Sequence, residues 1–573
     1  MNKVWKINKK APKEFLEKFP EFSKLTLQLL WDRGLKTQKA IDEFFSPDYD
    51  QDLHDPFLLK DVKKTIKRLE KAEKNNEKVA IFADYDADGI CGGIILHEIL
   101  EVYNIKPEVY IPDRNAEGYG LNLKSIEDIS KKKITLVLTV DCGVTDVEEV
   151  ALANKLGIDV IIVDHHEIPA SSAGRPKLPK AFAIIDPKQK QCKYPFNELS
   201  GAGVAFKLLQ AVRITKKLPI SWEKWLLDLV AISTVTDSML LFGENRTLVK
   251  YGLIVLSQTK RLGLKILMEK ARVTGNLTTY TIGFILGPRI NAASRVDHGI
   301  VAFELLLTKN IAEADRLSQQ LETRNQERQR HMERIIKEAR ERVKKDSNKS
   351  KIIFEGDETW TSGLVGLVAQ KLKDEFWMPA FICQLSKNHA VCSARGGIAG
   401  FDVIKALDEC KELLDEYGGH PFAGAFRADV CNLEKIKKIL EKVAEKKIKK
   451  TDMTAFLNID AEMIVDDLNW KVFDEIAKFE PFGGENSRPL FLLKDLKING
   501  MRNVGSKENH LKLSLEKETE TGTKKFGAIG FNLVDSCDKI ELGDRVDIVF
   551  EMLSNEWNGN KELQLKISDL KKI

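Results

Sequence analysis

Residues 79–94 read VAIFADYDADGICGGI, and this stretch determines how the surrounding chain is expected to fold. The apolar run 79–83 predicts a buried strand, and the apolar pattern that begins at Ile94 predicts a helix. Three carboxylates lie between them, where ligands bind in an open α/β sheet. They belong to Asp84, Asp86 and Asp88. Because neighbouring acids repel one another, a bound cation would hold them together, and a solvated acidic turn is the alternative.

The same arrangement of a strand followed by an acid recurs twice. The apolar run 134–140 ends in Asp141-Cys142-Gly143, and the run 160–163 ends in Asp164-His165-His166. Carboxylate and imidazole together suit manganese, iron or zinc. A single buried histidine is more often a core residue, but this pair completes a set of acids. The three motifs together therefore predict a metal site.

Composition limits the class of protein. A chain of 573 residues, 43% of them hydrophobic, is expected to form three or four domains. No segment resembles a transmembrane span, and the N-terminus lacks the apolar core of a signal peptide. The eight cysteines include no C-x-x-C pair, so we expect reduced thiols and a cytoplasmic protein. A net charge of +4 neither supports nor excludes nucleic acid.

Changes in pattern divide the chain into five predicted segments. Strands alternate with helices in the second segment and again in the fourth, which predicts an α/β fold with a parallel sheet in the second. Short alternating strands in the last segment predict a small β-barrel of the OB type, a fold that often binds single strands. The segments are a helical lead-in expected to pack against the sheet (1–75), the parallel-sheet domain (76–305), a long connecting helix (306–347), the second α/β domain (348–452) and the barrel (453–573).

Several polar segments are candidates for binding anions. The loop 113–120 contains Arg114 and Tyr119, and its glycines fit either a phosphate-facing loop or a plain turn. Ser200-Gly201-Ala202-Gly203 opens a helix, where backbone N–H groups can meet an anion. Three glycine-rich segments of the second α/β domain are either turns or an anion cradle. They span 360–363, 393–397 and 418–421. In the barrel, candidate contacts that are equally explained by packing or surface are Phe531, Phe550, Trp557, Lys512 and Lys561.

These motifs resemble the DHH phosphoesterases, and among them the bacterial RecJ exonucleases. The similarity extends nearly from end to end and also includes Thr236-Asp237, the segment 287–295, Gly418-Gly419-His420, the segment 481–486 and the turn 555–559. The resemblance implies a DHH domain, a connecting helix, a DHH-associated substrate-binding domain and an OB barrel. It further implies a 5′-to-3′ exonuclease that degrades single-stranded DNA to mononucleotides during DNA repair and recombination.

The resemblance also implies roles for particular residues. Two divalent ions, Mn²⁺ in most relatives and Mg²⁺ as the alternative, would be held by Asp86, Asp88, Asp141, His165 and Asp237. Asp84 and His166 would complete the catalytic set from close by. The substrate-binding candidates are Arg114, Tyr119, Arg289, Asn291, Ser393, Arg395 and His420. A single-strand-binding protein and a helicase are expected partners, and a monomer is the expected state.

The chain departs from the family pattern without losing a predicted metal ligand. Phe82 stands where some relatives have a metal-binding histidine, and Thr361 stands where RecJ proteins often have histidine. Ser294 replaces a usual glycine, and residues 423–425 permute the usual Ala-Ala-Gly. These changes bear on substrate binding and rate. Two alternatives stay open: a DHH phosphodiesterase for short oligonucleotides or cyclic dinucleotides, and a catalytically silent DNA-binding scaffold.

Overall fold

The computed structural model groups the chain into two compact units, which are Asp48–Met453 and the combination of Met1–Pro47 with Thr454–Ile573. The turn expected at 555–559 lies partly outside the described residues. Among those residues, none of the helices has the length and apolar character needed to span a bilayer. The structure describes residues 3–114, 116–168, 178–296, 298–345, 350–398, 400–449, 454–505, 507–520, 522–534, 540–557 and 560–573.

A parallel five-stranded sheet forms the first half of the unit Asp48–Met453, as the sequence predicts. Its strand order is β3-β2-β4-β5-β6, and every neighbouring pair is parallel. All residues of β2 and β4 are buried, which explains their uninterrupted apolar runs. The strands are β2 (Val79–Ala83), β3 (Glu108–Tyr110), β4 (Leu136–Val140), β5 (Asp159–Val163) and β6 (Ala183–Ile185).

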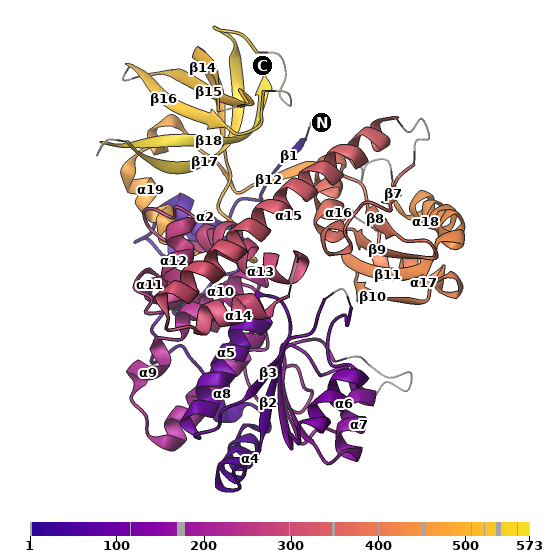
Figure 1. Cartoon of the computed structure of the whole chain (residues 1–573). Helices are drawn as coiled ribbons and strands as arrows, with labels where there is room; N and C mark the ends of the chain where they lie inside the picture. The colour runs from indigo at the N-terminus through magenta and orange to yellow at the C-terminus, as the bar shows by residue number, and fades with distance from the viewer. Residues whose placement is uncertain are drawn as a thin grey trace. The chain divides into compact units, whose positions relative to one another are not determined.

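Helices cover both faces of this sheet (Figure 1). Ile81 belongs to a core that includes residues of α4 (Val62–Lys74), α5 (Ala87–Val102) and α8 (Gly201–Lys216). Its neighbour Phe82 points to the other face and packs with residues of α6 (Leu123–Lys131) and α7 (Val147–Lys155). Since side chains alternate along a strand, one apolar strand supplies both cores.

A helical layer continues the chain beyond the sheet. Its last helix, α15, is 35 residues long and buries a narrow apolar stripe that includes Leu317, Leu321, Ile335 and Ala339. This helix contacts α12, α13 and α14 with its first part and α16 and β7 with its second, as expected for a helix that bridges two domains. The elements of this layer are α9 (Ile220–Lys224), α10 (Leu227–Thr236), α11 (Gly243–Ser257), α12 (Leu262–Lys270), the π-helix η2 (Thr281–Leu286), α13 (Gly287–Val296), α14 (Ile300–Leu307) and α15 (Ile311–Lys345), and the short helix η1 (Pro56–Leu58) precedes the sheet.

The second α/β half of this unit contains a mixed five-stranded sheet in the order β10-β11-β9-β8-β7. Helix α16 covers one face, and α17 and α18 cover the other. The expectation that all cysteines are reduced is wrong for two residues: Cys383 on β8 and Cys392 on β9 pair across the strands and form a disulfide. The elements are β7 (Ile353–Asp357), α16 (Ser362–Phe376), β8 (Ala380–Leu385), β9 (His389–Arg395), α17 (Val403–Asp408), η3 (Lys411–Leu413), β10 (Glu416–His420), β11 (Ala423–Asp429), η4 (Val430–Asn432) and α18 (Leu433–Lys447).

The other unit is built on the predicted barrel, in which β14 pairs with both β15 and β17 and so closes the sheet. The N-terminal helices were expected to pack against the parallel sheet, and for Met1–Pro47 this is wrong, since these residues belong to the barrel's unit. Strand β1 pairs with β12, and Arg33 donates to Asn486. The elements are β1 (Val4–Ile7), α1 (Lys13–Lys18), α2 (Lys24–Asp32), α3 (Gln38–Phe45), β12 (Phe456–Ile459), β13 (Ala461–Glu462), η6 (Val465–Asp467), α19 (Trp470–Ala477), β14 (Phe491–Val504), β15 (His510–Thr519), β16 (Gly522–Gly530), β17 (Arg545–Trp557) and β18 (Asn560–Lys572).

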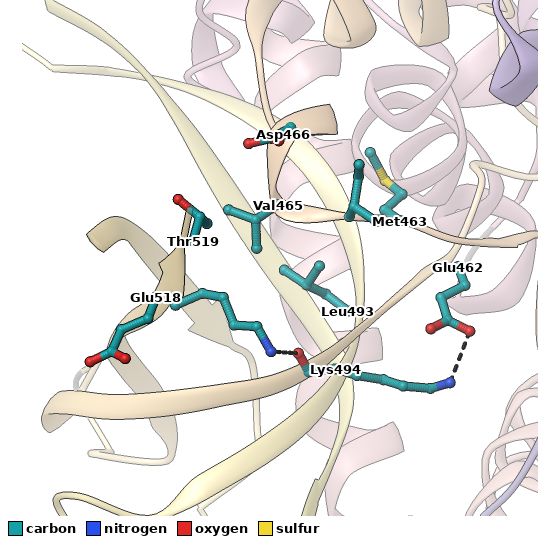
Figure 2. Close-up of a pocket in the computed structure, with 10 residues that line it drawn as sticks. Glu462, Met463, Val465, Asp466, Leu493, Lys494, Glu518 and Thr519 are labelled. Atoms are coloured by element: carbon teal, nitrogen blue, oxygen red, sulfur yellow. Dashed lines mark hydrogen bonds and ion pairs between the residues drawn. The ribbon is translucent and has the colours of Figure 1, made fainter. Parts of the chain in front are cut away.

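A pocket of about 300 Å³ lies beside the barrel, between the segment 462–466 and strands β14 and β15. Figure 2 shows Val465 and Leu493 within it and the ion pair of Lys494 with Glu462, 2.9 Å long, at its edge. The Lys517 ammonium donates to the backbone oxygen of Lys494. None of the acid motifs contributes to this pocket.

Candidate metal centre and nucleic-acid interface

The first acid motif is shaped by the junction of β2 and α5. Asp86 is the N-cap of α5, and its carboxylate accepts hydrogen bonds from the backbone N–H groups of Asp88 and Gly89. Asp88 lies in the first turn of the helix and is buried. A Cβ atom on Gly89 would lie 2.4 Å from the backbone oxygen of Asp84, so only glycine permits this close turn.

The other two motifs deliver their acids to the same place, because the carboxyl ends of parallel strands share one edge of the sheet. Asp141 follows β4 directly and adopts φ +60°, a left-handed conformation that aspartate tolerates better than most residues. His165 follows β5, and its Nε2 atom lies 3.2 Å from Asp141 Oδ1. The same nitrogen lies 3.6 Å from Asp88 Oδ2 and 3.6 Å from Oδ2 of Asp237, the C-cap of α10.

These side chains form three overlapping groups whose ligand atoms lie within 4.8 Å of one another. Asp141 belongs to two of the groups and His165 to two, so the three groups are continuous. The groups are Asp84-Asp86-Asp141, Asp141-His165-His166 and Asp88-His165-Asp237.

The electrostatics of the cluster fit divalent cations. Burial and the charges of the neighbouring carboxylates raise the pKa values of Asp84, Asp86 and Asp141, and they raise the pKa of Asp237 to about 8. Asp84 Oδ1 is buried and has no hydrogen-bond partner among the residues that the structure describes. Carboxylates that repel one another in this way gain a common partner when a hard cation binds, so the residues present fit divalent metal ions.

Asp88 is fixed by donors from two other helices. Its carboxylate accepts 2.7 Å hydrogen bonds from the N–H groups of Gly201 and Ala202 and a 2.6 Å bond from the Ser233 hydroxyl. The helix start at 200–203 was predicted to meet an anion, and the anion it meets is this carboxylate. Ser233 was not predicted, although a serine inside the apolar run of α10 was a signal that could have identified it.

His166 lies beside the acids in a second hydrogen-bonded group. Its Nδ1 atom is 2.8 Å from Asp164 Oδ1 and 3.1 Å from the Tyr119 hydroxyl, which also donates to the backbone oxygen of Asp141. Burial alone would lower the pKa of His166, but the hydrogen bond and charge of Asp164 raise it to about 9. Asp164 therefore favours the protonated imidazole of His166 when no cation is bound beside it, and the ring is partly exposed.

The candidates from α13 hold protein groups in this structure. Arg289 forms an ion pair of 2.6 Å with Glu322 and donates to the backbone oxygen of Ile285. The Asn291 amide oxygen accepts a 2.7 Å hydrogen bond from the N–H of Ala87, so it supports the first acid motif. Direct contact of either side chain with DNA stays a prediction.

Two other arginines lack carboxylate partners among the described residues. The Arg114 guanidinium lies 4.9 Å above the ring of Tyr85, and Arg395 donates to the backbone oxygen of Ala394. Burial and the charge of Arg114 both lower the pKa of Arg395. A Cβ on Gly366 would lie 3.1 Å from the Arg395 guanidinium and 3.4 Å from the Ser393 hydroxyl, so this glycine leaves room beside both side chains. His420 ends β10 and is exposed.

The residues that depart from the family pattern have ordinary structural surroundings. Phe82 is buried and stacks on Tyr110, with ring centroids 5.1 Å apart. The Ser294 hydroxyl donates to the backbone oxygen of Asn291. Thr361 is the N-cap of α16, and residues 423–425 lie on β11, where they pair with β9.

Comparison with known proteins agrees with this geometry. The model of the DHH family, N-terminal domain, matches residues 78–234, and the model of the RecJ OB domain matches residues 459–569. The single-stranded-DNA-specific exonuclease RecJ of Bacillus subtilis is 35% identical over 548 residues, covering 95% of this chain and 67% of the relative. The RecJ of Thermus thermophilus is 30% identical over 542 residues, covering 95% of this chain and 74% of the relative.

Solved structures lead to the same family. The crystal structure of Thermus thermophilus RecJ in complex with Mn²⁺ has a TM-score of 0.83 and 26% identity, covering 100% of this chain and 80% of that one. Its complex with Mg²⁺ has a TM-score of 0.77 and 26% identity, covering 100% and 78%. Sequence identity, both domain models and the fold of the whole chain therefore agree: the chain belongs to the RecJ family of single-stranded-DNA-specific exonucleases.

Proposed function

We propose that this protein is a metal-dependent exonuclease that degrades single-stranded DNA from its 5′ end and releases mononucleotides. The observation that carries the proposal is the continuous cluster of carboxylates and imidazoles in which Asp141 and His165 are shared between ligand groups. Its family membership supports the substrate class, and the RecJ structures with Mn²⁺ and Mg²⁺ support divalent metals.

Two cations would be held by Asp86, Asp88, Asp141, His165 and Asp237, with Mn²⁺ as the preferred metal. When bound, such ions activate a water molecule and stabilise the charge that develops at phosphorus. Asp88 is already positioned by three donors, and His165 Nε2 faces three carboxylates. The chain's own hydrogen bonds thus hold Asp88 in a position where it could serve as a ligand.

The chain's own cations would hold the phosphate. Asp164 holds the Nδ1 atom of His166, and the partly exposed ring would donate a hydrogen bond to a phosphate oxygen from its other nitrogen when it is protonated. Arg114 and Arg395 lie close enough for the charge of one to affect the other, and neither has a carboxylate partner among the described residues. A phosphate group between them would relieve this repulsion and satisfy both guanidinium groups.

Other parts of the proposal rest on the family resemblance alone. They are the 5′ polarity, the role in repair and recombination, the expected partners (a single-strand-binding protein and a helicase) and the monomeric state. The cytoplasmic location stays a prediction from the amino-acid sequence. The division at residues 75, 305, 347 and 452 also stays a proposal, and so does a direct role in catalysis or DNA binding for each named candidate.

The test is digestion of long single strands blocked at either the 5′ or the 3′ end, with Mn²⁺, Mg²⁺ or EDTA. We expect protection only by the 5′ block, mononucleotide products and no digestion with EDTA. Asp141→Ala should lower the rate at least about 10³-fold while the circular dichroism spectrum is unchanged. Digestion of dinucleotides but not of long strands would favour the short-substrate phosphodiesterase, and DNA binding without any hydrolysis would favour the silent scaffold.

A further inference from the structure

Two aromatic side chains, one just before η2 and one within it, project into solvent. Tyr280 is 63% exposed and Phe284 is 70% exposed. Their rings are stacked, with centroids 4.9 Å apart and an interplanar angle of 21°. Thr281, Ile282 and Leu286 of the same turn are buried, so the exposed pair stands on an anchored base. Two exposed rings that stack on each other form a contiguous apolar patch, which is a candidate interaction site.

The backbone beneath the pair is unusual as well. Residues Thr281–Leu286 form a π-helix, a geometry that is rare and is frequently found at functional sites. Arg289 donates a 2.8 Å hydrogen bond to the backbone oxygen of Ile285, the residue after Phe284. A guanidinium group therefore contacts the backbone one residue along the chain from the exposed Phe284.

Packing ties this turn to the end of α10. A Cβ on Gly283 would lie 3.6 Å from Val235, and one on Gly287 would lie 2.4 Å from Thr236. Thr236 directly precedes Asp237, whose carboxylate lies 3.6 Å from His165 Nε2. The turn that carries the aromatic pair therefore packs on the helix whose C-cap is Asp237.

We propose that Tyr280 and Phe284 form a stacking platform for unpaired bases of the DNA strand that enters the metal centre. The inference rests on the proposed function and adds a base-binding surface to the phosphate-binding residues. Exposed rings bind any base, because every base has a π-face, and they suit an enzyme that must accept all sequences. Paired bases bury their faces in the duplex stack, so the platform also favours single strands.

The test measures base-dependent binding without hydrolysis. Fluorescence anisotropy with Ca²⁺ in place of Mn²⁺ compares a labelled oligothymidylate with a strand of equal length in which tetrahydrofuran residues replace several nucleosides. The double variant Tyr280→Leu, Phe284→Leu keeps the apolar bulk and removes both π-faces. Ile254→Ala, which truncates another exposed apolar side chain of the same unit, is the matched control.

We expect the double variant to bind oligothymidylate about fivefold or more weakly, since stacking on one ring contributes about that much per base. Its affinity for the abasic strand should stay within twofold of the parent, and the control should match the parent on both strands. If the double variant binds both strands as tightly as the parent does, the platform is overturned. An equal loss of affinity for both strands would overturn it too, because the rings would then act through folding or charge.

Other outcomes separate the two proposals. Loss of self-association in sedimentation, with the strand ratio intact, would mean that the rings bind a second copy of the chain and not bases. A parent protein that fails to digest single strands with Mn²⁺ would contradict the proposed function. Digestion by the parent together with an unchanged strand ratio in the double variant would contradict the platform alone.

Discussion

The Ser233 hydroxyl donates a 2.6 Å hydrogen bond to Asp88 Oδ1, and this bond links α10 to the acid motif at the start of α5. The Ser200 hydroxyl lies 2.6 Å from that of Ser233, so a chain of hydroxyl groups also reaches the start of α8. Three helices therefore fix one carboxylate, whose pose does not depend on a flexible loop.

Ser233→Ala should weaken Mn²⁺ binding about tenfold or more, because hydrogen-bond partners of metal ligands typically contribute that much. Loss of a hydrogen bond to a buried charged group should also lower the free energy of unfolding by about 1–3 kcal/mol. Calorimetric titration with Mn²⁺ and urea denaturation measure the two effects. Ser257→Ala, which removes an exposed hydroxyl at the end of α11, should change neither. Unaltered Mn²⁺ affinity in Ser233→Ala would show that Asp88 does not need this donor.

The chelated protein should lose thermal stability as the pH rises from 5 to 8. Burial and neighbouring charges raise the pKa of Asp237 to about 8 in the folded state, far above its unfolded value. The folded state therefore holds more protons than the unfolded state in this range, and its stability falls with increasing pH. The pKa of His166 is raised to about 9, so its contribution to stability also falls as the pH rises from the ordinary histidine pKa toward 9.

Saturating Mn²⁺ should reverse most of that loss, because the cation replaces the protons. Scanning fluorimetry at several pH values with EDTA or Mn²⁺ gives the comparison. Asp237→Asn should flatten the slope seen in EDTA. Parallel curves with EDTA and with Mn²⁺ would argue against a metal bound to these acids.

Arg395→Ala should weaken binding of single strands and reduce the dependence of log Kd on log salt concentration by about one. The guanidinium is largely enclosed and has only a backbone oxygen as a partner in the described structure, so its removal should cost little stability. Arg427→Ala, on the adjacent strand β11 and exposed, is the control and should leave both quantities unchanged. Equal salt dependence in both variants would mean that Arg395 does not contact a phosphate.

A protein limited to residues 48–453 should fold, bind Mn²⁺ and cleave, but hold long strands more weakly. This unit contains every predicted metal ligand, whereas the barrel belongs to the other unit together with Met1–Pro47. A cut near residue 455 alone would leave β1 without its partner β12, so both segments must be removed. Circular dichroism checks folding, and anisotropy with a long single strand checks affinity. Full affinity without the barrel's unit would exclude a role for it in DNA binding.

The parallel sheet and the meeting of its acids could be predicted because they depend on local order. Each apolar run that ends in an aspartate places that residue at the carboxyl edge, and adjacent parallel strands then bring Asp84, Asp141 and His165 together. The long helix α15 and the barrel strands could also be predicted, since their hydrophobic periodicity extends over many residues.

Contacts between distant side chains could not be predicted from such patterns. The sequence around Arg289 does not indicate that Glu322 forms an ion pair with it. The sequence around Asn291 does not indicate that its amide oxygen accepts a hydrogen bond from Ala87. The disulfide of Cys383 with Cys392 requires that β8 and β9 be adjacent in one particular register. The N-terminal helices were placed against the wrong domain for the same reason: their partners, such as Phe479 for Phe44, lie far along the chain.

The pairing of β1 with β12 has a consequence for biosynthesis. Ser23 and its hydrogen-bond partner Glu475 are 452 residues apart, so at typical translation rates the ribosome needs about 20 to 90 s to make the second after the first. Residues 48–453 emerge in that interval and can fold as a unit. Strand β1 must meanwhile wait, with its backbone hydrogen-bonding groups exposed to water, until its partner β12 has been translated.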